Sequence, residues 1–236
     1  MAVALRTYNL IAIAGLANSG KDCASSMLQY ILNAPKIFRT YRFYKIFRKF
    51  PFKKRFKITA FAKPLKQALS VILNKPLNWF NIRENKENYY VVLDTLKIVH
   101  KDSLIWEKLS ENKFQKLIKS GEPLPTDTFI SIRQLMQYFG TECVRHYLGD
   151  KTWINATLNV HPNERIIVSD LRFKVEYQEV KNRNGLTIYI QRNSAKPGTH
   201  ASEREVIDLY ENNAFDYIIE NNGTLKDLFN NLKKIV

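Results

Sequence analysis

Short apolar runs alternate with segments of helical periodicity along this chain. The runs that predict buried strands cover residues 9–14, 57–62, 165–170, 186–192 and 215–220. Amphipathic patterns separate these runs and predict helices between them. Alternation of strands and helices is typical of the α/β class, so we expect a mostly parallel sheet with helices on both faces.

Three helices follow from local signals. One is predicted directly after the first strand, over 21–32, and another begins at Pro64, a residue that suits the first turn of a helix. The third covers 131–148, where apolar residues recur at helical spacing. On its polar side, four residues fall at successive four-residue steps and predict one stripe: Arg133, Gln137, Thr141 and Arg145. Such a stripe is usually only the solvated face of a helix.

Between residues 74 and 127 the sequence is polar, charged and aromatic, with weak helical patterns such as 104–119. We interpret this stretch as a helical insertion in one domain. Trp79 and Trp106 are expected to be packing residues.

Composition agrees with one globular domain. The chain has 236 residues, of which 45% are hydrophobic, enough for one buried core of the α/β size range. Its apolar runs are too short to cross a bilayer, and the N-terminus does not resemble a secretion signal. Two cysteines, Cys23 and Cys143, fit a reducing compartment and are expected to be inert. These features predict a soluble cytoplasmic protein.

Charge is the unusual part of the composition, because the net charge is +15. Residues 36–57 hold ten Lys or Arg and no acid, interleaved with Phe and Tyr. One interpretation is weak nucleic-acid binding, with cations on phosphates and rings on bases. The favoured interpretation is a basic flap whose aromatic residues pack on the core, with a positive field that attracts anionic substrates.

The stretch with the clearest chemistry is GLANSGKD, Gly15 to Asp22. It fits the phosphate-binding P-loop pattern G-x-x-x-x-G-K-[ST] at every position except the last. Gly15 and Gly20 allow a tight backbone whose N–H groups face an anion, and Lys21 reaches the β- and γ-phosphates. Asp22 replaces the hydroxyl that normally binds Mg²⁺, although a carboxylate can hold the metal too. The alternative is a chance Gly-rich turn.

Asp170 and Arg172 follow the predicted strand at 165–170. Active sites of open α/β sheets lie at the carboxyl ends of the strands. Asp170 is therefore placed where a metal-linked or substrate-holding acid would lie, and Arg172 where a phosphate would need it. The alternative is a surface ion pair at a strand end.

Several short motifs occur here in the order that one family shows. They are SGKD, FAKPLKQAL, RQLMQYFGTECVR, TWINA, VSDLRF, HASE and ENNGTLKDL. Together they cover about half of the chain, and they resemble the deoxynucleoside monophosphate kinases of bacteriophages and large DNA viruses. Asp after the P-loop Lys is common in that family. The departures are Cys23, where the family usually has Thr, and Lys63, where it often has Asp.

The resemblance implies a P-loop kinase with a five-stranded parallel sheet and a lid, and it does not cover the helical insertion or the basic flap. Such an enzyme transfers the γ-phosphoryl group of ATP to a deoxynucleoside monophosphate with Mg²⁺. It also implies a viral source, the host cytoplasm as location, and a homodimer.

Residue roles follow from the same resemblance. ATP and Mg²⁺ are assigned to Gly15, Asn18, Ser19, Gly20, Lys21, Asp22 and Cys23. The catalytic residues are Lys21, Asp170 and Arg172, with Asp22 and Asp170 as metal ligands. Acceptor binding is assigned to Arg133, Gln137, Arg145 and Arg172, with Trp153 stacking on the base. Arg192 and Arg204 bound a lid over 192–204.

Two other functions fit part of the sequence. Phosphomevalonate kinases of animals also carry a GKD loop and an Asp-x-Arg pair, so those motifs alone do not separate the two kinases. A basic nucleic-acid-binding protein with a relic P-loop would explain the net charge and residues 36–57. The stretches RQLMQYFGTECVR and TWINA favour the nucleotide kinase.

Overall fold

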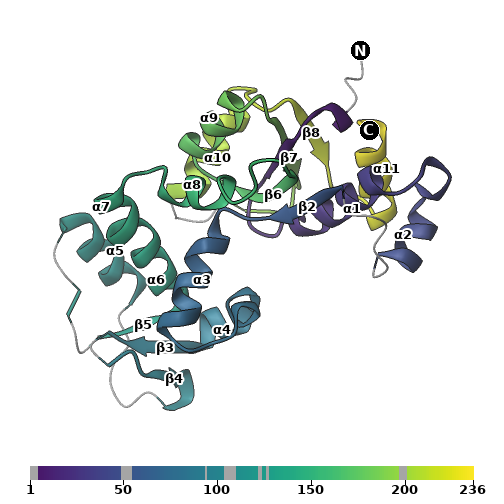
Figure 1. Ribbon diagram of the computed structural model, residues 1–236. Coiled ribbons are helices and arrows are strands. Elements are labelled where there is room, and N and C mark those ends of the chain that lie inside the picture. The colour runs from purple at the N-terminus through teal and green to yellow at the C-terminus, as the bar shows by residue number, and fades with distance from the viewer. Residues whose placement is uncertain are drawn as a thin grey trace. The chain divides into compact units, whose positions relative to one another are not determined.

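The computed structural model describes residues 5–48, 55–93, 95–103, 110–121, 124–125, 128–196 and 201–236 (Figure 1). The chain forms two compact units. The first combines Met1–Phe61 with Ile154–Val236, and the second is Ala62–Trp153. The expected domain organisation, one nucleotide kinase domain over the whole chain, stays a prediction.

A five-stranded sheet forms the centre of the first unit. Its strands are β1 (Leu10–Ala14), β2 (Phe56–Thr59), β6 (Arg165–Leu171), β7 (Leu186–Gln191) and β8 (Tyr217–Glu220). Their order is β2-β6-β1-β7-β8, and every neighbouring pair is parallel. The predicted five-stranded parallel sheet is thus confirmed, with β1 in the middle.

Helices cover both faces of this sheet (Figure 1). They are α1 (Lys21–Asn33), α2 (Tyr41–Phe47), α8 (Thr152–Leu158), α9 (Lys174–Asn182), α10 (Ala201–Glu211) and α11 (Leu225–Lys234). Side chains of β1 alternate between two cores, as a strand buried on both faces requires. Ile11 and Ile13 pack in the core that includes residues of α1 and α11. Ala12 and Ala14 pack in the core that includes residues of α8, α9 and α10.

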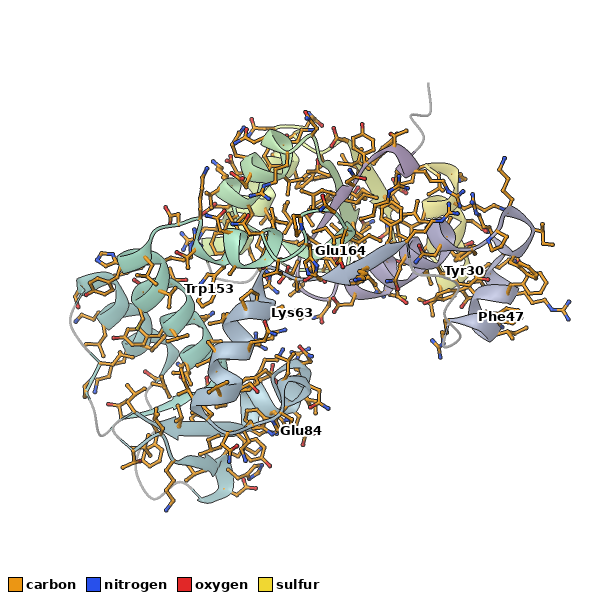
Figure 2. The ribbon with its side chains drawn as sticks, in the orientation of Figure 1. Tyr30, Phe47, Lys63, Glu84, Trp153 and Glu164 are labelled. Atoms are coloured by element: carbon orange, nitrogen blue, oxygen red, sulfur yellow. The ribbon has the colours of Figure 1, made fainter. Side chains whose placement is uncertain are left out.

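The described part of the basic flap contributes its rings to the first unit. Tyr44 is buried in the core, and Phe38, Tyr41, Phe43 and Phe47 pack against it. Figure 2 shows Phe47 on α2 and Tyr30 on α1, and the Tyr30 hydroxyl donates to Phe38 O at 2.9 Å. Packing of these aromatic residues on the core, as the favoured interpretation predicted, is confirmed. Residues 49–54 of the flap lie outside the described residues.

The second unit combines helices with a small antiparallel sheet of order β4-β3-β5. The helices are α3 (Ala62–Ile72), α4 (Arg83–Asn88), α5 (Glu111–Ser120), α6 (Ile132–Gln137) and α7 (His146–Leu148). The strands are β3 (Tyr89–Val92), β4 (Ile98–His100) and β5 (Phe129–Ser131). Short 3₁₀ turns occur at Leu5–Thr7, Lys36–Phe38, Leu77–Asn81 and Lys101–Ser103.

The insertion predicted over 74–127 is therefore not helical throughout, because it contributes β3 and β4. Tyr89–Val92 is a run of aromatic and β-branched residues, which favour strands. Val91 is fully buried in the core of the second unit, and Trp79 packs against that core as expected. Trp106 lies outside the described residues, as does most of the first half of the predicted helix 104–119.

The helix predicted over 131–148 is continuous but not regular. Ser131 caps α6 in a reciprocal capping box with Gln134, and residues Tyr138–Arg145 then form a π-helix before α7. The prediction of one α-helical stripe is wrong from residue 138 onward, because π-helical hydrogen bonds join residues five apart. The carbonyl of Gly140, inside the π-helix, also accepts a hydrogen bond from Trp153 Nε1 at 2.8 Å.

None of the helices in the described part of the chain has the length and apolar character needed to cross a bilayer.

Candidate nucleotide-binding site

The P-loop sequence lies between β1 and α1, at the carboxyl end of the central strand. The chain moves from β1 to β2 and β6 on one side of the sheet and then to β7 and β8 on the other. Ligands of open α/β sheets bind at such a reversal of strand order. The loop therefore occupies the expected place for a bound anionic substrate.

Two glycines give the loop its shape. Gly15 has φ of 148°, and a Cβ there would lie 2.6 Å from Ser19 Oγ and 2.7 Å from Ile190 O. Gly20 has φ of 94°. Residues with a side chain rarely adopt these backbone conformations, so any residue other than glycine would strain the loop. Ser19 is buried, and its Oγ has no hydrogen-bond partner among the atoms of the protein. A bound ligand could supply that partner.

Asn221 supports the loop from the other end of the chain. Its side-chain Nδ2 donates to Ser19 O at 2.8 Å, and a Cβ on Gly20 would approach the same nitrogen to 2.4 Å. Asn221 directly follows β8 and is buried. This role of Asn221 was not predicted from the sequence, where the residue occurs within the motif ENNGTLKDL. Its position at the carboxyl end of a parallel strand was the available signal.

The ammonium of Lys21 is fixed at the site and loses its proton more easily than that of an ordinary lysine. Its Nζ donates to Leu16 O at 2.7 Å, across the loop. Burial, followed by the positive charge of Arg172, lowers the pKa of Lys21 to about 8. Three carboxylates raise this pKa: those of Asp22, Glu203 and Asp170. These three groups and the guanidinium of Arg172 therefore lie near the ammonium. An anionic phosphate would restore the charge of Lys21.

Asp170 sits at an irregularity of the sheet. Along the β1–β6 pair the register shifts between Ala12 and Ala14, so that Ser169 and Asp170 lie opposite the single residue Ile13. Bulges of this kind re-aim side chains and are frequent beside active sites. The Asp170 carboxylate accepts a hydrogen bond from Phe61 N at 2.6 Å, which fixes its direction.

Glu176 holds the backbone that carries Arg172. Its Oε2 accepts from Arg172 N at 2.7 Å and from Phe173 N at 3.1 Å. Burial, followed by the negative charge of Asp170, raises the pKa of Glu176 to about 8. The buried carboxyl was not predicted from the sequence, because the mostly polar pattern of α9 is typical of a surface helix.

The residues predicted to bind Mg²⁺ suit a metal that is shared with phosphates. Among the described residues, no group of three or more His, Cys, Asp or Glu side chains is arranged to hold a metal alone. Mg²⁺ in phosphoryl-transfer sites usually takes one or two carboxylates, substrate oxygens and water. Asp22, which is exposed, and Asp170 provide two carboxylates beside Lys21. The donor set therefore fits the ion.

Other predicted residues of the first unit are placed as follows. Asn18 is exposed with φ of 62°, a conformation that Asn tolerates. Burial raises the pKa of the Cys23 thiol, which agrees with an unreactive cysteine. Arg192 is exposed and donates to Ser194 Oγ at 3.1 Å, and Arg204 is exposed on α10. Residues 197–200 of the predicted lid, with His200, lie outside the described residues.

The predicted acceptor residues belong to the second unit, apart from Arg172. Arg133 pairs with Glu87 at 3.1 Å, and Arg145 pairs with Asp150 at 3.2 Å. Gln137 Oε1 is buried without a hydrogen-bond partner among the atoms of the protein. The ring of Trp153 packs against the core of its unit.

Comparison with protein families shows which family the chain belongs to. The model of the family "Deoxynucleotide monophosphate kinase" matches residues 66–232, well over half of the chain. The chain belongs to the deoxynucleotide monophosphate kinase family. The match covers Arg133, Asp170 and Asn221 but begins after the P-loop. The P-loop is identified by its sequence pattern and its backbone geometry instead. Membership makes the chain a relative of nucleotide kinases.

Individual relatives add less to the family assignment. A protein of Acanthamoeba polyphaga mimivirus with the provisional name deoxynucleotide monophosphate kinase is 26% identical over 115 residues. That alignment covers 42% of this chain and 58% of the relative, so the chain spans little more than half of the relative's length. Dephospho-CoA kinase from Campylobacter jejuni is 14% identical with a TM-score of 0.38, over 96% of this chain and 94% of that one. The fold is established by the sheet itself.

Proposed function

We propose that this protein transfers the γ-phosphoryl group of ATP to deoxynucleoside 5'-monophosphates, giving diphosphates for DNA precursor synthesis. The observation that carries the proposal is the environment of Lys21. Its half-buried ammonium follows the loop at the end of β1 and lies near Asp22, Asp170 and Arg172. Family membership supports a nucleotide as the substrate.

Binding of the donor is assigned to the loop Gly15 to Cys23. Its backbone N–H groups and the N-terminus of α1 attract phosphate oxygens, and Lys21 turns from Leu16 O toward the β- and γ-phosphates. Mg²⁺, when bound through Asp22 and Asp170, would neutralise charge on the phosphates. Asn221 keeps the Ser19 carbonyl in place, which preserves the shape of the loop.

Phosphoryl transfer asks the protein mainly to align two anions and to neutralise charge on the moving group. Arg172 is assigned to that charge, because a guanidinium can hold two phosphate oxygens at once. Arg133, Gln137, Arg145 and Trp153 are assigned to the acceptor, and Arg192 and Arg204 to a lid that excludes water. The acceptor's phosphate is already nucleophilic, so the proposal includes no general base.

An acceptor screen tests the proposal. The full chain is incubated with ATP and Mg²⁺ and each of dAMP, dCMP, dGMP and dTMP, with ribonucleotides and phosphomevalonate as comparison acceptors. We expect diphosphate formation from one or more deoxynucleotides and none from phosphomevalonate. Turnover of phosphomevalonate alone, or of no acceptor while ATP still binds, would contradict the proposal.

A further inference from the structure

A basic groove runs where α2 meets α11, apart from the P-loop. The two helices pack through rings, with Phe229 lying 5.9 Å from Tyr41 and 5.6 Å from Tyr44 between centroids. Beside this contact is a cavity of about 460 Å³, within the size range of small-molecule sites. Its lining consists of Arg39, Thr40, Tyr41, Arg42, Lys45, Lys226, Asn230 and Lys233.

The cations of this groove come from two helix faces and the turn before α2. Lys226, Asn230 and Lys233 are four and three residues apart on α11, so they share one face of that helix. Arg42 and Lys45 are three apart on α2 and share a face in the same way. The arrangement of the groove is therefore built into both helices.

Arg39 is the buried member of the set. Only 8% of this residue is exposed, and its Nε donates to Ala34 O at 3.0 Å. Its Nη2 is buried and has no hydrogen-bond partner among the atoms of the protein. A buried cationic donor without a partner is costly, and an anion that enters the groove would supply that partner.

The groove also gathers charge of one sign. Its lining holds five cations and no carboxylate. Among the ion pairs formed by the described residues, none involves Arg39, Arg42, Lys45, Lys226 or Lys233. Mutual repulsion of these cations is relieved by a ligand of high negative charge density.

We propose that this groove binds a compact polyphosphate anion, such as the triphosphate of a free nucleotide. The helix α1 runs 13 residues from Lys21 to Asn33, so Ala34 and Arg39 lie at the end of α1 opposite the P-loop, about 20 Å along its axis. The end of the groove that holds Arg39 is therefore separate from the P-loop. Burial of Arg39 favours a small ligand that enters the cavity over a nucleic-acid backbone that follows exposed cations. The inference does not depend on the proposed kinase activity.

Calorimetric titration of the full chain with inorganic tripolyphosphate tests this site. The matched variants are Lys233→Glu, which lines the groove, and Lys234→Glu, the next residue on α11, which does not. Both residues are exposed in the last turn of the helix, and both substitutions change the net charge equally. We expect two binding sites in the wild type and in Lys234→Glu.

In Lys233→Glu, we expect the groove site to weaken by about tenfold or more, because a charge-assisted contact is lost and a repulsive one is gained. The P-loop site should keep its affinity, which separates this result from a failure of the kinase proposal. Equal weakening in both variants, or a single site that Lys21→Ala abolishes, would overturn the inference. The inference would also be overturned if Lys233→Glu weakened the binding of a DNA oligonucleotide but left the binding of tripolyphosphate unchanged.

Discussion

Asn221 and Ser19 are 202 positions apart in the chain and are joined by a buried hydrogen bond of 2.8 Å. The side-chain amide of Asn221 donates to the carbonyl of Ser19, inside the P-loop. Asn221 N in turn donates to Gln191 O at the end of β7, so the loop is connected to two further strands. The phosphate-binding backbone is thus positioned by the carboxyl edge of the sheet.

Asn221→Ala is expected to weaken ATP binding by about three- to tenfold and to lower stability by about 1–2 kcal/mol, because the Ser19 carbonyl loses its buried donor. The affinity for ATP and the free energy of unfolding are the quantities to measure. Asn182→Ala, on the exposed surface of α9, makes the same chemical change away from the loop. Equal ATP affinity in the two variants would refute the supporting role of Asn221.

Binding of ATP near pH 8 should be coupled to proton uptake. The pKa of Lys21 is lowered to about 8, and a bound triphosphate raises it again, so the complex holds a proton that the free protein partly lacks. We expect uptake of about half a proton at pH 8, measured by calorimetry in buffers of different ionisation enthalpy.

Lys21→Arg is the matched variant for this experiment. It keeps the positive charge, but a guanidinium does not deprotonate in this range, so its complex should form without that uptake. Uptake of the same size in both proteins would show that another group is responsible.

Stability should fall as the pH rises from about 4.5 to about 8 because of Glu176. The pKa of Glu176 is raised to about 8 in the folded protein from a usual value of 4.5. Below pH 4.5 the carboxyl is protonated in both states, whereas above it the unfolded chain releases a proton that the folded chain retains. The contribution of the neutral carboxyl is therefore lost progressively across this range.

Glu176→Gln removes this titration while its amide oxygen can still accept from Arg172 N. We expect the variant to gain about 3 kcal/mol relative to the wild type between pH 4.5 and pH 7. Chemical denaturation at a series of pH values measures the difference. Glu211→Gln, at an exposed end of α10, should keep the wild-type profile. A pH-independent difference between Glu176→Gln and wild type would contradict the assignment.

Arg145 can be separated into a structural and a binding role. Arg145→Ala and Asp150→Ala both remove the 3.2 Å ion pair between these residues, but only the first removes the guanidinium. If Arg145 binds the acceptor, Arg145→Ala should raise the KM for the deoxynucleotide by about tenfold or more and change the KM for ATP little. Asp150→Ala should leave both values near wild type. Equal effects of the two substitutions would assign Arg145 to structure alone.

The regular parts of the fold follow from local pattern. The strands of the parallel sheet were predicted within two residues at most ends, because strands buried on both faces are continuous apolar runs. The P-loop was equally readable, because its glycines and Lys21 must occur at fixed spacing. Strand β3, however, is a short apolar run inside a polar stretch, and periodicity alone does not assign such a run.

Features that depend on distant contacts were not predictable. The π-helix at Tyr138–Arg145 coincides with a hydrogen bond from Trp153 to Gly140, which the helical pattern does not encode. Asn221 is one of several Asn residues in a polar turn, and only the fold brings it to Ser19. Arg39 reads as one cation of a basic run, and its burial depends on how α2 packs beside α11.

Transfer of labelled phosphate tests the proposed kinase activity most directly. Wild-type protein, Lys21→Ala and Lys174→Ala are incubated with γ-labelled ATP, Mg²⁺ and the four deoxynucleoside monophosphates. Lys174 is an exposed residue of α9 in the same unit, so its variant controls for loss of one charge. We expect labelled deoxynucleoside diphosphate from the wild type and from Lys174→Ala, and almost none from a folded Lys21→Ala. Transfer at the wild-type rate by Lys21→Ala, or none by the wild type, would contradict the proposal.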